Sequence, residues 1–247
     1  MVTQNDRPLV SCICLTHNDA SLLRRSIKCF QEQTYEKREL ILVFDENNPN
    51  AAAMIEQISD PLIKPLIFPT NQKMTLGEKR NTAIDEARGV FFCVWDDDDW
   101  HHNRRIEAQV ESIIGTECKA SVLSSIILAD SQSGTYLSAT RWGWEQTLCC
   151  EKSLFDHHDW TYLTKDRGED SALIYNLKNS GLLHTLSLAY LYIYVYHGGN
   201  VFTRDHWETN LLPWAKKLSA EQDLVIRSIL KGEIENPMAS TSLQNFL

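Results

Sequence analysis

Short apolar runs alternate with stretches of helical periodicity through the first half of the chain. Residues 9–15, 39–44 and 90–95 are almost wholly apolar, a pattern typical of strands buried in a sheet. Between them, apolar side chains recur at the three- and four-residue spacing of one helix face. This alternation predicts an α/β fold in which helices flank a mostly parallel central sheet.

One predicted helix has a clear start and a clear end. Thr75 and Glu78 have the spacing of a capping box, in which each side chain bonds a backbone N–H of the first turn. The helix is expected to run to Arg88, and Gly89 to end it in the left-handed conformation.

The remaining segments are less regular. Residues 62–68 contain proline and are expected at an edge of the sheet. Residues 122–128 and 135–140 flank a Ser/Gly turn and predict a hairpin. A helix is expected to start within 166–170, and residues 182–196 are rich in β-forming residues.

No internal repeat or linker divides the chain. Residues 1–205 are therefore expected to form one α/β domain. Residues 206–247 are expected to form a short C-terminal helical extension, in which 219–230 has the helical pattern.

Composition and charge narrow the class of protein. The 24 Lys and Arg against 33 Asp and Glu give a net charge of −9, which argues against nucleic acid bound through general basicity. No run approaches the length of a membrane span, and the first residues lack a signal-peptide pattern. Seven cysteines without metal-site spacing predict reduced, buried thiols and a cytoplasmic protein.

The strongest chemical signal is the run Asp96-Asp97-Asp98-Asp99, which directly follows an apolar strand and precedes Trp100. Four adjacent carboxylates repel one another unless cations or hydrogen-bond donors lie among them. Because ligands bind at the carboxyl ends of strands in open α/β sheets, we interpret the run as a site for Mg²⁺ or Mn²⁺ and a substrate diphosphate. The alternative is a solvated acidic loop.

Other polar residues follow predicted strands in the same way. Thr16, His17 and Asn18 follow the first strand, and Asp45 ends the second, where it could accept a hydrogen bond from a nucleobase. The alternative is an ordinary turn, since strand ends often turn through Asn and Asp.

Basic residues at a helix start form a second candidate. The helix opened by Thr75 is expected to offer free N–H groups and the positive end of its dipole, with Lys79 and Arg80 in its first turns. Such an end favours phosphate; the alternative is a capped helix with two exposed basic side chains.

Three residues of the second half are candidates for proton transfer or metal binding. Glu169 or Asp170 could serve as a general base, or could merely complement a helix dipole. His197, beside two glycines, is a candidate ligand of a metal or diphosphate, with a structural histidine as the alternative. The adjacent pairs His101-His102 and 157–158 are expected at the surface.

Taken in their order along the chain, these motifs resemble those of the inverting GT-A glycosyltransferases of the family 2 type, typified by bacterial polysaccharide synthases. The resemblance covers about residues 8–200. The segments that carry it are 10–18, 39–45, 76–89, 96–98, 167–170 and 197–200.

This resemblance implies a GT-A domain and a role for several residues. Asp96 would face the ribose and sugar with Asp97 beside it, Asp98 would hold the cation, and Asp170, next to Glu169, would be the base. His197 would belong to a terminal His motif that only some members have.

The implied activity is transfer of a sugar, with inversion, from a UDP- or GDP-sugar to a saccharide or lipid-linked saccharide in surface polysaccharide biosynthesis. A lipid-linked acceptor would imply peripheral attachment to the inner face of the membrane. Two alternatives stay open. One is a nucleotide-sugar pyrophosphorylase, although the glycine-rich loop of that class is missing from residues 14–20. The other is an inactive nucleotide-sugar or glycan-binding module.

Overall fold

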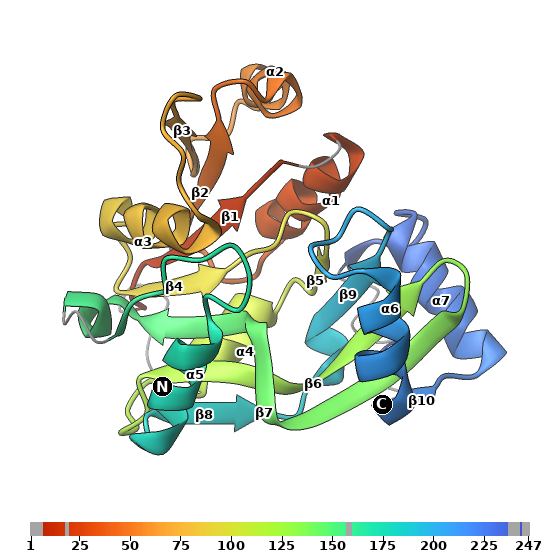
Figure 1. The fold of residues 1–247 in the computed structure, drawn as a ribbon. Helices are drawn as coiled ribbons and strands as arrows, with labels where there is room; N and C mark the ends of the chain where they lie inside the picture. Colours follow the sequence, from red (N-terminus) through yellow and green to blue (C-terminus); the bar gives the residue numbers. More distant parts are fainter. Residues whose placement is uncertain (1–6, 18–19, 157–159, 237–242, 244–247) are drawn as a thin grey trace.

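The computed structural model describes residues 7–17, 20–156, 160–236 and 243. Within these residues the strands form one mixed sheet in the order β3-β2-β1-β4-β7-β6-β9-β5, with β10 paired to β7 and β8 to β6 (Figure 1). The strands are β1 Val10–Leu15, β2 Arg38–Asp45, β3 Ile63–Phe68, β4 Phe91–Val94, β5 Trp100–His101, β6 Ala120–Asp130, β7 Gly134–Glu151, β8 Leu183–Leu186, β9 Tyr192–Tyr196 and β10 Ala215–Lys217. The helices are α1 Ala20–Gln31, α2 Pro49–Gln57, α3 Leu76–Glu86, α4 Arg105–Glu111, α5 Ser171–Asn179, α6 Arg204–His206 and α7 Ala220–Leu230.

The first half of the chain forms the parallel part of the sheet. β2 and β4 pair with β1 in parallel, and β3 pairs with β2 at the edge, as its prolines predict. The antiparallel part begins at β7, which pairs with β4 and forms the predicted hairpin with β6. The α/β prediction is therefore confirmed.

Alternation along the central strands divides the core into two layers. Cys12 and Cys14 of β1 face a cluster that includes Leu23 of α1, while Ile13 faces a cluster that includes Ile84 of α3. Successive side chains of a strand point to opposite faces of the sheet, so an apolar run without alternation in polarity is buried on both sides.

A buried carboxylate ties the first strands to the segment after α3. Glu39 of β2 is 1% exposed and accepts hydrogen bonds from Ser11 (2.8 Å), Lys64 (2.9 Å) and the guanidinium of Arg88 (2.7 Å). Burial alone would raise the pKa of Glu39, but these bonds lower it to about 2. The charge is retained because every partner stabilises the ionised form.

α3 ends two residues before the predicted position, and the predicted role of Gly89 as a left-handed cap is wrong. The helix ends at Glu86, Ala87 is extended, and Gly89 does not have a positive φ. A Cβ at Gly89 would lie 2.5 Å from the Phe91 carbonyl oxygen and 2.7 Å from the Ser11 nitrogen. Glycine is required here by close packing, and not by a left-handed cap.

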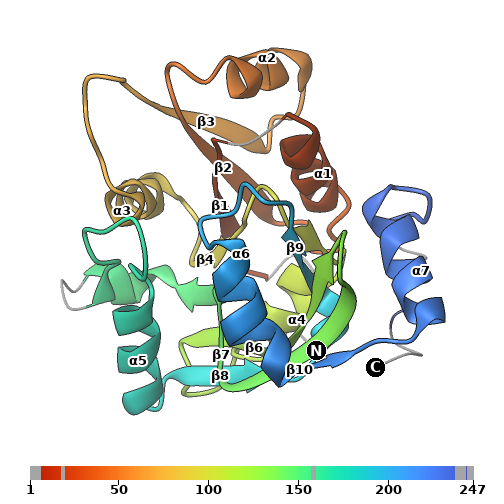
Figure 2. The ribbon, with the colours of Figure 1, turned by 45° about the vertical axis from the view of Figure 1, so that its right-hand side comes forward.

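β7 is much longer than the predicted strand at 135–140, and it bends. Gly143 has a φ of +81° and lies within the strand, next to shifts in the pairing with β6. Both views place this bend between α5 and α6 (Figures 1 and 2). The strand therefore continues through an aromatic-rich passage that has no clear strand pattern.

The C-terminal segment packs on the main core. α7 starts at a capping box formed by Ser219 and Gln222, within the predicted 219–230 helix, and its Ile226 and Ile229 join the cluster of β1 and α1. The division of the chain at residue 205 stays a prediction. No helix among the described residues is long and apolar enough to cross a membrane.

Candidate active site

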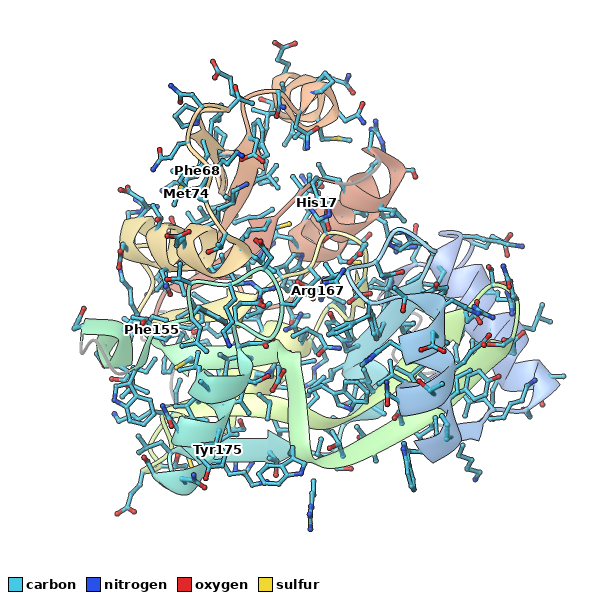
Figure 3. All side chains as sticks on the ribbon, viewed as in Figure 1. His17, Phe68, Met74, Phe155, Arg167 and Tyr175 are labelled. Carbon is cyan, nitrogen blue, oxygen red and sulfur yellow. The ribbon has the colours of Figure 1, made fainter. Side chains whose placement is uncertain are left out.

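A cavity of about 1100 Å³ lies at the carboxyl ends of β1 and β4. Its other walls are the bend of β7 (138–146), the loop before α5 (166–171) and residues between 199 and 214. His17 and Arg167 line it from opposite halves of the chain, and both are labelled in Figure 3. The cavity therefore joins motifs that lie up to two hundred residues apart.

The four carboxylates after β4 do not all face this cavity. Asp96, Asp97 and Asp98 line it, whereas Asp99 is buried and accepts hydrogen bonds from the Tyr192 hydroxyl and the Val195 N–H (2.8 Å). Burial raises the pKa of Asp96 to about 7, and the charges of Asp98 and Asp97 add to the shift. The carboxylates are therefore as close to one another as the sequence predicts. The hydrogen bonds of Asp99 connect the acidic run to β9.

Buried hydrogen bonds hold the backbone at the start of the acidic run 96–99 in place. Arg105 is fully buried and donates to His101 Nδ1 (2.5 Å) and to the Val94 carbonyl (2.8 Å). A guanidinium can only donate, so His101 Nδ1 accepts and Nε2 donates to the Asp96 carbonyl at 3.0 Å. Burial and Arg105 hold the pKa of His101 well below its usual range.

The surface prediction for the pair His101-His102 is therefore wrong. Both side chains are buried, since the run turns inward to form β5. The second pair, 157–158, lies outside the described residues.

His197 contacts the carboxylate predicted to hold the cation. His197 Nε2 lies 3.0 Å from Asp98 Oδ2, and the Gly199 N–H donates to Nδ1 at 3.3 Å. His197 N–H bonds Asn200 Oδ1 (2.9 Å), which fixes the turn that carries the ring. In the part of the chain that the structure describes, no three His, Cys, Asp or Glu side chains are grouped to hold a metal.

Arg80 joins the two acidic motifs. Its guanidinium pairs with Glu169, lies 3.6 Å from Asp96 Oδ1 and packs over the Tyr162 ring. Burial raises the pKa of Glu169, and Asp170 adds to the shift while Arg80 opposes it. Glu169 is thus engaged by Arg80, which leaves Asp170 as the carboxylate of the pair without that contact.

Glu145 is a site residue that the sequence did not reveal. It lies at the bend of β7, lines the cavity, and accepts from the Ser171 hydroxyl at 3.4 Å. Burial raises the pKa of Glu145 to about 8, with further contributions from the charge of Asp170 and a hydrogen bond to it. Its only signal in the sequence was a lone carboxylate within an aromatic passage.

The prediction of free N–H groups at the start of α3 is wrong. The Leu76 N–H donates to Asp166 Oδ1 and the Gly77 N–H to the Lys165 carbonyl, both at 3.0 Å. The next N–H donates to the Thr75 hydroxyl, in the predicted capping box. The helix start is therefore filled by the loop before α5, about ninety residues away in the chain.

The remaining predicted residues lie near the ends of β1 and β2. Lys79 Nζ pairs with Asp45 at 2.6 and 2.8 Å, and neither residue lines the cavity. Thr16 is buried and bonds β2 through its backbone, whereas His17 is exposed and lines the cavity. Asn18 lies outside the described residues.

Comparison with known proteins gives consistent matches. The model of the family described as Glycosyl transferase family 2 matches residues 11–172. An uncharacterized glycosyltransferase of Methanocaldococcus jannaschii is 33% identical over 111 residues, which is 44% of this chain and 38% of that protein. A GalNAc(5)-diNAcBac-PP-undecaprenol beta-1,3-glucosyltransferase of Campylobacter jejuni is 30% identical over 94 residues, 37% of this chain and 30% of that protein.

Solved structures share the fold at low sequence identity. The mannosyltransferase PcManGT of Pyrobaculum calidifontis, in complex with GDP-Man and Mn²⁺, has a TM-score of 0.61 at 15% identity over 99% of this chain and 76% of that one. S. aureus TarS in complex with UDP-GlcNAc has a TM-score of 0.63 at 14% identity over 96% of this chain and 71% of that one. The family match spans well over half of the chain and includes both acidic motifs, so the chain belongs to glycosyl transferase family 2.

Proposed function

We propose that this protein transfers a sugar, with inversion, from a UDP- or GDP-sugar to a hydroxyl of a saccharide or lipid-linked saccharide. The observation that carries the proposal is the convergence of Asp96, Asp98, Arg80 and Asp170 on one cavity at the carboxyl ends of β1 and β4. PcManGT with GDP-Man and TarS with UDP-GlcNAc support a nucleoside-diphosphate sugar as the donor. A place in polysaccharide biosynthesis and a cytoplasmic location, with peripheral membrane contact for a lipid-linked acceptor, stay predictions from the sequence.

A divalent cation fits the donor set of this cavity. Asp98 would bind it through a carboxylate oxygen, with donor diphosphate and water oxygens as further ligands, an arrangement that Mg²⁺ and Mn²⁺ accept. His197 would add Nε2 as a ligand in the tautomer that carries its hydrogen on Nδ1, which replaces the bond from the Gly199 N–H. The Mn²⁺ of the PcManGT complex is consistent with this. When bound, the cation would neutralise charge on the departing diphosphate.

Proton transfer and the stabilisation of charge are assigned to side chains of this protein. The acceptor oxygen forms a bond to the anomeric carbon while the bond to the diphosphate oxygen breaks, and Asp170 takes the acceptor proton. Arg80 carries positive charge between Asp96 and Glu169, so it can stabilise negative charge that develops at the donor. Inversion follows if the acceptor displaces the diphosphate in a single step without a covalent sugar intermediate.

Exchange of Asp170 tests the assigned base. Asp170→Asn retains size and hydrogen-bonding capacity but loses the basic oxygen, so we expect turnover to fall by roughly 100-fold or more. Turnover is measured as release of UDP or GDP from a panel of UDP- and GDP-sugars. The exposed Glu56→Gln on α2 is the matched control and should behave as wild type.

The paired variant makes this test decisive. Near-normal turnover of Asp170→Asn together with an inactive Glu169→Gln would show that the base is misassigned. If both variants stay active, the mechanism fails. Release of pyrophosphate in place of nucleoside diphosphate would favour the pyrophosphorylase.

A second variant tests the cation. Asp98→Ala removes a carboxylate from the crowded run, so the fold should persist while Mn²⁺-dependent donor binding is lost. Calorimetric titration of Mn²⁺ and donor measures both. Undiminished activity of Asp98→Ala in excess chelator would contradict the assignment.

A further inference from the structure

Three of the large aromatic side chains that line the cavity are exposed. Trp214 is 79% exposed, Trp142 46% and Phe202 43%. They come from a 3₁₀ turn at Leu212–Trp214, from β7 and from the loop after β9, yet all three line the one cavity. Exposed apolar side chains gathered in a concave site mark a binding surface more often than a packing defect.

Two of these rings are held in place before any ligand binds. Lys178 Nζ lies 4.0 Å from the centroid of the Trp142 ring and donates to the Arg141 carbonyl at 2.7 Å. Phe202 stacks on His206 with centroids 4.2 Å apart and planes at 17°. A platform fixed in this way loses little conformational entropy on binding.

The cavity is larger than a single small ligand needs. Its volume of about 1100 Å³ lies at the upper end of the usual range for ligand sites, roughly 300–1000 Å³. The residues assigned to the donor occupy only the end near β1 and β4. The wall between 199 and 214, together with the bend of β7, is left for a second substrate.

The chemistry of this wall matches a saccharide. A pyranose ring presents an apolar C–H face that stacks on an indole, and a rim of hydroxyls that needs hydrogen-bond partners. Polar side chains of Arg141, His206 and Asn210 line the cavity beside the aromatic rings. A lipid chain would instead require a continuous apolar wall.

We propose that Trp214, Trp142 and Phe202 form the acceptor subsite, and that the acceptor is a saccharide of at least two sugar units. The inference rests on the proposed function, because it assigns the second substrate of the same cavity. Asp170 and Glu145 line the same cavity as these rings, so a saccharide stacked on the rings shares the cavity with the assigned base.

Steady-state kinetics with defined acceptors tests the proposal. The probes are 4-nitrophenyl monosaccharides and disaccharides of hexoses and N-acetylhexosamines, with the donor found by nucleotide release. We expect a lower KM for disaccharides than for monosaccharides. Trp214→Ala should raise the disaccharide KM about tenfold, an effect of ~1.4 kcal/mol, with a smaller change in the donor KM, and Trp214→Phe should restore part of the loss. Leu224→Ala on α7, which removes an exposed leucine outside the cavity, should match wild type.

Three results would overturn the inference. The first is an unchanged disaccharide KM in Trp214→Ala. The second is donor hydrolysis without transfer to any of these free saccharides, which leaves the proposed use of a nucleoside-diphosphate sugar, and transfer to a lipid-linked saccharide, standing. The third is binding to phosphatidylglycerol vesicles that Trp214→Ala abolishes without any effect on saccharide kinetics. Absence of nucleotide release from every donor would overturn the proposed function and this inference together.

Discussion

Glu145 and Asp170 both line the cavity and form a pair of interacting carboxyl groups. Burial and the neighbouring Asp170 raise the pKa of Glu145 from 4.5 to about 8, so at neutral pH Glu145 carries a proton that it shares with Asp170 by a hydrogen bond. A protonated Glu145 places one negative charge fewer beside Asp170 and Glu169. Glu145 therefore positions the base and limits repulsion inside the site.

This pairing predicts a pH dependence of stability. Below pH 4.5 Glu145 is protonated in both the folded and the unfolded state. As pH rises from 4.5 to 8 the unfolded chain loses that proton and the folded chain keeps it, so the free energy of unfolding falls. We expect the free energy of unfolding of Glu145→Gln to fall less over this pH range than that of wild type. The Tm of Glu145→Gln should therefore be higher than that of wild type at pH 8.

Thermal unfolding at pH 5 and pH 8 measures the effect, with Glu56→Gln as the control at an exposed position. Parallel pH curves for wild type and Glu145→Gln would contradict the raised pKa.

At the scale of elements, the start of α3 is the support for the loop that carries Glu169. The Asn81 side chain bonds both the N–H and the carbonyl of Tyr162 at 2.9 Å, and the Gly77 N–H bonds the Lys165 carbonyl. A Cβ at Gly77 would lie 1.9 Å from the Leu163 carbonyl oxygen. Glycine at this position lets backbone pack directly on backbone.

Gly77→Ala is therefore expected to displace the loop and separate Glu169 from Arg80. Forced overpacking of this kind costs about 1–3 kcal/mol of stability, and donor turnover should fall by roughly 100-fold, because small displacements of positioned groups have effects of that size. Tm and nucleotide release are the two measurements.

The matched control is Gly115→Ala, where the added Cβ meets nothing within 4 Å and only the positive φ of 76° is strained. This variant should lose some stability and keep its turnover. Wild-type turnover in Gly77→Ala would show that the loop does not depend on this contact.

Over the whole molecule, three buried apolar clusters pack on the sheet, and all six buried cysteines lie in the two clusters on either side of β1. All seven are free; six are buried and Cys118 is partly exposed. Burial raises the pKa of Cys29 to about 12 and that of Cys14 well above its usual range. Reaction of the buried thiols therefore requires the core to open.

This arrangement predicts the course of thiol labelling. Ellman's reagent should modify one thiol per chain rapidly in native buffer, and six more only in denaturant. Cys118→Ser should abolish the rapid phase and leave the others unchanged. Several rapidly reacting thiols in native buffer would show that the layers open locally.

Features that depend on neighbours along the chain could be predicted from the amino-acid sequence. Periodicity predicted the parallel strands and their helices, proline predicted the edge position of β3, and spacing predicted the capping box of Thr75. The acidic run at the end of β4 was evident because strand, carboxylates and Trp100 are adjacent in the sequence. Such signals reflect local sterics and hydrogen bonding, which act within a few residues.

Contacts between distant segments became known from the folded chain alone. Asp166 fills the start of α3 from 90 residues away, and the bend of β7 brings Glu145 to Asp170. His101 is buried because Arg105 provides a partner for its ring. These outcomes depend on packing between distant segments and on the dielectric environment that burial creates, and neither is encoded in the periodicity of a single stretch of chain.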